Sequence, residues 1–134
     1  MELAKLPLLL HALLEAAASL SFTLHPQAQL PALNDEARLI LRSYGGLLLS
    51  SSVLCAGFCL RPGFDSATRL VAGSMALYHL FPIGRAVIRL RKQAREKKNG
   101  GEGRVLGGPA VHLAVHLLAV VGLAGSAAFG GDSL

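Results

Sequence analysis

The sequence has few charged residues, only two cysteines and no tryptophan. Charged residues make up 16% of its 134 residues against 52% hydrophobic residues, and the mean hydropathy is +0.50. Charges this sparse exclude an ordinary water-soluble domain and indicate an integral membrane protein. Two cysteines are too few for a disulfide scaffold, and they form no CxxC metal motif. The length leaves no room for a separate soluble catalytic domain beside four membrane spans.

Acidic residues are fewer than basic ones, and the formal net charge is +5. Such an excess can indicate nucleic-acid binding, but here it lies almost wholly between residues 89 and 104. A short basic segment between hydrophobic stretches is typical of a cytosolic loop that sets membrane orientation, although it can also contact anionic lipid. We therefore expect membrane lipid, and no nucleic acid, as a partner. Nucleotide and flavin motifs are absent from the sequence, so no organic cofactor is expected.

Four hydrophobic stretches are long enough to cross a bilayer, which takes about 20 mainly apolar residues. They predict an all-α integral membrane four-helix bundle forming one transmembrane domain, with spans at 6–24, 43–60, 70–90 and 109–129. The second helix is expected to begin near Ala37, with Asn34 or Asp35 as its cap, and to pack closely because it is rich in small residues. Residues 61–65 are expected to form a tight turn, and residues 89–104 a flexible, solvated basic loop.

The basic residues predict the orientation of this bundle. Four spans place the loops at 25–36 and 89–104 on one side, and both termini on the other. The side with the two loops carries most of the basic residues, namely Arg38, Arg42, Arg89, Arg91, Lys92, Arg95, Lys97, Lys98 and Arg104. The opposite side carries Lys5, Arg61 and Arg69. The positive-inside rule therefore predicts cytosolic loops and non-cytosolic termini.

The third span carries polar side chains inside an apolar stretch. Ser74, Tyr78 and Arg85, together with Phe81, form one stripe along this helix, and His79 lies about 100° round from it. Pro82 cannot donate a hydrogen bond to the Tyr78 carbonyl, so a kink is expected there. Polar groups at this depth usually face a bundle interior. Arg85 has a simpler interpretation, in which its long side chain reaches the interface.

Other spans contribute ionisable groups at a similar depth. His11, Glu15 and Ser19 recur at i,i+4 on the first helix, and His112 and His116 do so on the fourth. At about 1.5 Å rise per residue, Glu15, His79 and His116 fall within roughly two helical turns of one level. A central acidic residue costs about 2.5 to 3.5 kcal/mol on insertion scales, which favours a firm partner or a task for Glu15.

We therefore expect a polar pocket enclosed by an apolar bundle. Interhelical hydrogen bonding is the simpler interpretation for the histidines and the tyrosine taken singly. A Glu–His–Tyr set in an apolar pocket suits proton transfer on a lipophilic substrate, as in epoxide opening, cyclisation or double-bond isomerisation. A metal site is a weaker alternative, because the residues between His112 and His116 are all apolar, whereas the familiar metal helix carries a Glu between its histidines. No metal is expected.

Several short patterns add a resemblance. They are His11-x-x-x-Glu15, Ser43-Tyr44-Gly45-Gly46, Arg61-Pro62 and Tyr78-His79-x-x-Pro82-x-x-Arg85. With the length and span count, they resemble the small fungal four-helix membrane proteins encoded in polyketide gene clusters. Among these are epoxide hydrolases of the aurovertin and citreoviridin type and the small membrane partners of decahydrofluorene cyclisation. The likeness covers most of residues 6–90, and residues from 105 onward only in layout.

The resemblance implies an epoxide hydrolase or cyclase that acts on a polyene-derived polyketide at the endoplasmic reticulum or another internal membrane. Glu15 would act as general base or covalent nucleophile, and Tyr78 or His79 would protonate the epoxide oxygen. His116 and His11 would orient Glu15. The substrate would be held by His11, His112, Arg85, Ser19 and Ser74.

Two other functions stay open. The first is that of a non-catalytic membrane partner that positions a lipophilic intermediate for a larger biosynthetic enzyme. The second is that of a small membrane oxygenase similar to the fungal anthrone oxygenases, which share the four-span layout. Homo-oligomers, or association with other biosynthetic membrane enzymes, are compatible with each function.

Overall fold

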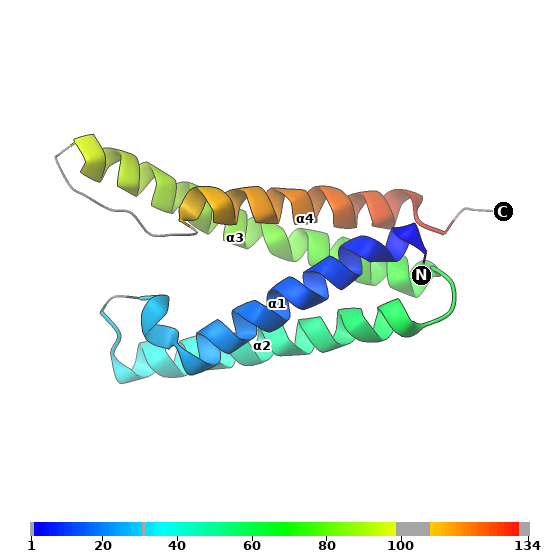
Figure 1. The fold of residues 1–134 in the computed structure, drawn as a ribbon, viewed down its shortest axis with the longest axis horizontal. Helices are drawn as coiled ribbons and strands as arrows, with labels where there is room; N and C mark the ends of the chain where they lie inside the picture. Colours follow the sequence, from blue (N-terminus) through cyan, green and yellow to red (C-terminus); the bar gives the residue numbers. More distant parts are fainter. Residues whose placement is uncertain (1, 31, 99–107, 132–134) are drawn as a thin grey trace. The chain divides into compact units, whose positions relative to one another are not determined.

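The computed structural model describes residues 2–30, 32–98 and 108–131, and for residues 96–98 only the backbone. Within these residues the chain is all-α, which confirms the predicted class (Figure 1). Its four α-helices are α1 (Leu6–Leu24), α2 (Asp35–Leu60), α3 (Ser66–Lys98) and α4 (Pro109–Phe129). Two short 3₁₀ helices, η1 (Leu3–Lys5) and η2 (Pro26–Ala28), precede and follow α1.

All four α-helices of the described residues are long and apolar enough to cross a membrane. Large hydrophobic side chains such as Leu60, Leu70 and Phe129 are exposed along them, as expected for surfaces that face lipid. The fold therefore supports a multi-pass membrane protein. The side of the membrane on which the termini lie stays a prediction.

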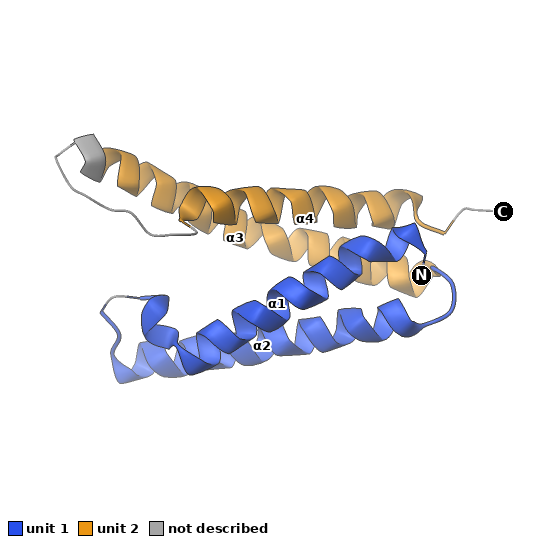
Figure 2. Ribbon diagram, viewed as in Figure 1, with its two compact units in different colours: residues 1–64 blue, residues 65–134 orange. Residues whose placement is uncertain are grey.

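The chain forms two compact units, residues 1–64 and residues 65–134 (Figure 2). Each unit is a helical hairpin, α1 packed on α2 in the first and α3 packed on α4 in the second. The arrangement of both hairpins as one transmembrane domain stays a prediction.

The predicted bounds of two helices and one predicted helix cap agree with the structure. α1 and α4 span the predicted residues 6–24 and 109–129, each with a proline at its start, where the missing N–H breaks no helical bond. α2 begins at Asp35 because the Asn34 side chain accepts a hydrogen bond from the Ala37 N–H at 2.8 Å. The predicted cap at Asn34 is confirmed.

The predicted loop at 89–104 is wrong in its first part, because α3 continues as a helix to Lys98. Residues 89–98 are Arg, Lys, Gln, Glu, Leu and Ala, all good helix formers, and they contain no glycine or proline. Polarity alone therefore did not end the helix. The rest of the predicted loop lies outside the described residues.

At its other end α3 begins after a turn that the sequence predicted. Gly63 has φ of 71°, a left-handed conformation that costs glycine little. Asp65 then caps the helix, since its Oδ1 accepts hydrogen bonds from the Thr68 N–H at 2.8 Å and from the Thr68 hydroxyl at 2.7 Å. The helix continues through Pro82 without ending.

Close backbone approach joins α1 to α2. Gly45 is buried, and a Cβ placed on it would lie 2.6 Å from Thr23 Cγ2 and 3.2 Å from Phe22 Cβ. Next to it the rings of Phe22 and Tyr44 meet edge to face at 5.1 Å. A small residue is therefore required at Gly45, as predicted for the small-residue helix, whereas a Cβ on Gly46 would meet nothing within 4 Å.

Polar contacts hold the same hairpin at two levels. In its middle the Ser52 hydroxyl donates to the Ala12 carbonyl at 2.7 Å. At its end the buried Lys5 ammonium group donates to the Arg61 carbonyl, and Cys59 Sγ donates to the Lys5 carbonyl at 3.7 Å. The start of α1 and the end of α2 thus lie together.

In the second hairpin an arginine joins the start of α3 to the end of α4. Arg69 donates from Nε to the Ala127 carbonyl at 3.0 Å and from Nη2 to the Ala128 carbonyl at 2.6 Å. These carbonyls belong to the last turn of α4, where no helical N–H remains for them. Gly73 approaches the same region, since a Cβ on it would lie 3.7 Å from Ala127 Cβ.

Candidate active site

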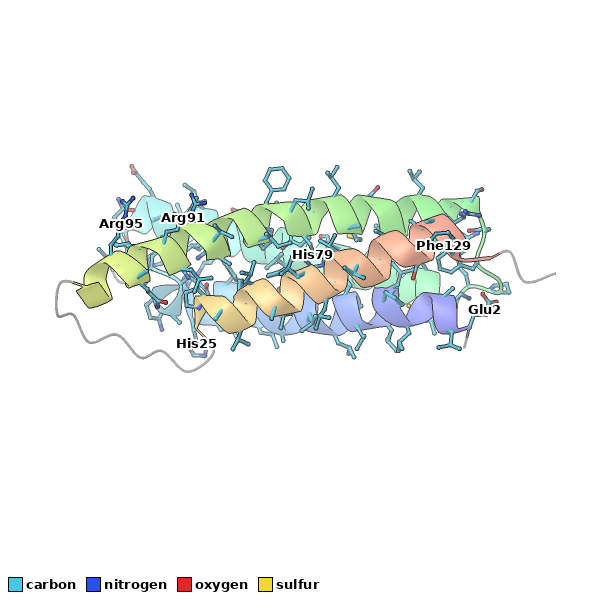
Figure 3. All side chains as sticks on the ribbon, turned by 90° about the horizontal axis from the view of Figure 1, so that it is seen from above. Glu2, His25, His79, Arg91, Arg95 and Phe129 are labelled. Atoms are coloured by element: carbon cyan, nitrogen blue, oxygen red, sulfur yellow. The ribbon has the colours of Figure 1, made fainter. Side chains whose placement is uncertain are left out.

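Three histidines lie in contact inside the second hairpin. His79 Nδ1 of α3 lies 2.7 Å from His116 Nδ1 of α4, and His116 Nε2 lies 3.2 Å from His112 Nε2. Both separations are hydrogen-bond distances. Figure 3 labels His79 between α3 and α4. His112 and His116 share one face of α4, as their i,i+4 spacing predicted.

Burial increases along this histidine chain. His112 in the first turn of α4 is exposed, His116 is 8% exposed, and His79 is fully buried. The guanidinium groups of Arg85 and Arg89 on α3 are close enough to His112 to act on it electrostatically. The histidine chain therefore leads from the basic end of the hairpin to His79, a side chain without solvent contact.

His79 lies on the face of α3 that carries small buried residues, among them Ala72, Ala76 and Ala86. With His79 and the buried Pro82, these residues recur every three or four positions, which matches one side of a helix. Alanines allow α4 to approach closely enough for an imidazole to span the gap to His116. The local sequence therefore positions His79 by leaving room beside it.

The other predicted site residues of α3 lie on different faces. Ser74 is exposed, and its hydroxyl donates to the Leu70 carbonyl of its own helix at 2.8 Å, so it takes no part in the histidine chain. Phe81 is 75% exposed. Tyr78 is half-buried, with its ring 5.1 Å from that of His79, and Arg85 is also half-buried.

The first hairpin holds a second set of buried polar groups on α1. His11, Glu15 and Ser19 are 1%, 3% and 3% exposed, so they share the buried face that the i,i+4 spacing predicted. The Ser19 carbonyl accepts a hydrogen bond from the Thr23 hydroxyl at 2.8 Å, beside the closest approach of α2. Glu15 also lies close enough to Cys55 of α2 to act on its thiol electrostatically. The meeting of Glu15 with His79 and His116 stays a prediction.

Within the second hairpin the imidazoles form a chain and do not converge on one point. His116 turns Nδ1 toward His79 and Nε2 toward His112. One metal ion cannot use these facing nitrogens of all three residues, since they point at two separate gaps. Each gap has the length of an N–H···N hydrogen bond. This geometry suits proton transfer.

Sequence reasoning placed His79 and His116 at one depth and expected them to meet in a polar pocket, but it did not predict that their rings are in direct contact. The signal that pointed to His79 was the alanine spacing around it, since small residues mark where transmembrane helices approach closely.

Comparisons of the chain with protein-family models, with curated proteins and with solved structures give no match. The fold and the site support one class, a multi-pass membrane protein with imidazoles buried between two of its helices.

Proposed function

We propose that the chain is a membrane-embedded acid–base enzyme that opens a lipophilic epoxide, by water or by a hydroxyl of the substrate itself. The observation that carries the proposal is the fully buried His79 in contact with His116. Imidazole is the side chain best suited to give and take protons near neutral pH.

The buried groups of α1 supply the second half of acid–base chemistry. Glu15 is a carboxyl group at the middle of an apolar helix, with His11 one turn before it on the same face. Burial of a carboxyl group in a membrane is costly, which favours a task for it. We assign Glu15 as general base and His79 as general acid, with Tyr78 beside His79.

The reaction balances with these groups alone. Glu15 takes the proton of the attacking hydroxyl or water as its oxygen bonds to one epoxide carbon. The bond between that carbon and the epoxide oxygen breaks, and its electron pair stays on the oxygen. His79 then donates a proton to this oxygen. Nothing is oxidised or reduced, and apolar walls that restrict water favour cyclisation over hydrolysis.

An epoxide is proposed as the substrate because opening it requires one base and one acid at opposite ends of a short bond. The sequence resemblance supports the same class and adds a polyene-derived polyketide as the lipophilic part. The internal membrane, which we propose to be the endoplasmic reticulum, follows from the same resemblance.

Microsomes from yeast that express the chain test the proposal. The probes are trans-stilbene oxide and the bisepoxide of a conjugated polyene ester, with diol and cyclic ether products separated by chromatography. Glu15→Gln and His79→Ala should each lower turnover by about 10²-fold or more, the usual contribution of a general acid or base. Glu36→Gln and His25→Ala are matched controls, because both positions are exposed and lie outside the four spans' apolar parts.

Turnover that is equal in wild type, Glu15→Gln and His79→Ala would contradict the catalytic assignment. A protein that opens neither probe, yet is required for product formation by a larger enzyme, would instead fit a non-catalytic partner. Consumption of dioxygen with substrate would indicate an oxygenase.

A further inference from the structure

We propose that His112, His116 and His79 form a proton relay that connects the basic end of the second hairpin to the buried acid. The proposal rests on the proposed function, since it explains how His79 regains the proton that it donates. The relay itself is defined within one hairpin, by contacts between α3 and α4.

The arrangement of the middle imidazole supports a relay. His116 uses both ring nitrogens, one toward each neighbour. A neutral imidazole carries one N–H and one acceptor nitrogen, so His116 must donate to one neighbour and accept from the other. A proton added at one end of such a chain can therefore leave at the other without any ring moving.

The position of the two ends supports the same function. His112 is exposed in the first turn of α4, near Arg85 and Arg89, whereas His79 is fully buried. From His112 to His116 the helix rises about 6 Å, and the step from α4 to α3 then crosses the hairpin. A buried acid without such a path would exchange its proton slowly, because an apolar interior excludes water.

The proton steps can be written in full for the direction in which His116 donates to His79. A solvent proton binds His112 Nδ1, and His112 passes the proton of its Nε2 to His116 Nε2. His116 passes the proton of its Nδ1 to His79 Nδ1, and His79 releases the proton of its Nε2 to the epoxide oxygen. Each ring has gained one proton and lost one, and each ends as its other tautomer.

The relay can then carry a proton in the opposite direction. Both hydrogen bonds persist with donor and acceptor exchanged. A proton that binds His79 Nε2 can therefore leave through His116 and His112. This return restores the first tautomers, so the two passes together move no net proton through the relay and leave it reset.

A direct test is independent of turnover. The full chain is labelled with ¹⁵N-histidine, placed in lipid nanodiscs and examined by NMR for couplings across N–H···N hydrogen bonds. We expect one coupling between the Nδ1 atoms of His79 and His116, and another between the Nε2 atoms of His116 and His112. His116→Phe should abolish both, and His25→Ala should abolish neither.

A kinetic test uses the same probes as the proposed function. His112→Ala should lower kcat by about tenfold with KM unchanged, because general acid–base steps depend on proton supply. A rise in KM with kcat unchanged would instead fit the substrate-holding role expected from the sequence and would overturn the relay. Added imidazole should restore this loss, since position 112 is exposed, whereas it should not restore Glu15→Gln. Far-UV circular dichroism checks that each variant is folded.

The outcomes separate the relay from the proposed function. Absent N–N couplings overturn the relay, whatever the activity. Couplings with an undiminished kcat in both His112→Ala and His116→Phe also overturn it, while loss of activity in Glu15→Gln would leave the proposed function standing. A wild-type chain that opens no epoxide refutes the proposed function, and the couplings then decide the relay alone.

Discussion

Replacement of Gly45 by alanine should weaken the first hairpin, while the same change at Gly46 should not. The two glycines are neighbours on α2 and differ in what a new methyl group would meet. At Gly45 the Cβ would lie 2.6 Å from Thr23 Cγ2 and 3.2 Å from both Phe22 Cβ and the Ser19 carbonyl oxygen. At Gly46 nothing lies within 4 Å.

The difference between the variants isolates the packing cost. Both gain up to about 1 kcal/mol from the better helix propensity of alanine. Only Gly45→Ala must move its neighbours, and rotation of Thr23 would disturb the bond of its hydroxyl to the Ser19 carbonyl, 2.8 Å long. Overpacking of this kind costs about 1 to 3 kcal/mol. We therefore expect Gly45→Ala to be less stable than Gly46→Ala by about that amount.

Titration with sodium dodecyl sulfate in mixed micelles, followed by far-UV circular dichroism, gives the free energy of unfolding of each variant. Intrinsic fluorescence is a poor probe because the chain has no tryptophan. Equal stability of the two variants would refute the close approach of α1 and α2 at Gly45. Thr23→Ser in the Gly45→Ala background should recover part of the loss, because it removes the nearest methyl group.

Other contacts give predictions of smaller size. Ser52→Ala removes the hydroxyl that bonds the Ala12 carbonyl and should cost about 0.6 kcal/mol in the same titration, the average for such bonds between membrane helices. Asn34→Ala removes the cap of α2 and should cost about 1 kcal/mol, whereas the exposed Arg38→Gln on the same helix should cost less. Arg69→Gln removes two bonds to the last carbonyls of α4, so amide hydrogen exchange in residues 127–131 should accelerate while that around His116 stays unchanged.

Much of the fold could be predicted from hydropathy and from the positions of proline and glycine. The bounds of α1 and α4 agree because Pro7 and Pro109 open them and because their apolar runs end where the helices end. The end of α3 could not be predicted this way. Charged residues form helix as well as apolar ones do, so the change in polarity after Leu90 marks a change of environment and leaves the helix intact.

The sequence singled out the three histidines that are in contact, but it could not give their arrangement. Spacing alone placed His112 on the face of His116, because i,i+4 geometry is local. The contact of His116 with His79 depends on how far each helix is rotated about its axis, and packing of side chains from both helices sets that rotation. The sequence could not place Ser74, because a serine hydroxyl can donate its hydrogen bond to a carbonyl of its own helix and then needs no partner on another helix.

The length of α3 has a consequence for the surface of the membrane. A helix of 33 residues measures about 50 Å, whereas hydrocarbon is about 30 Å thick. One end of α3 must therefore extend beyond the hydrocarbon core, or the whole helix must be strongly tilted. Figure 3 labels Arg91 and Arg95 near the C-terminal end of α3, and both are exposed. Binding of this basic segment to the phosphate groups of lipids should therefore weaken as ionic strength rises.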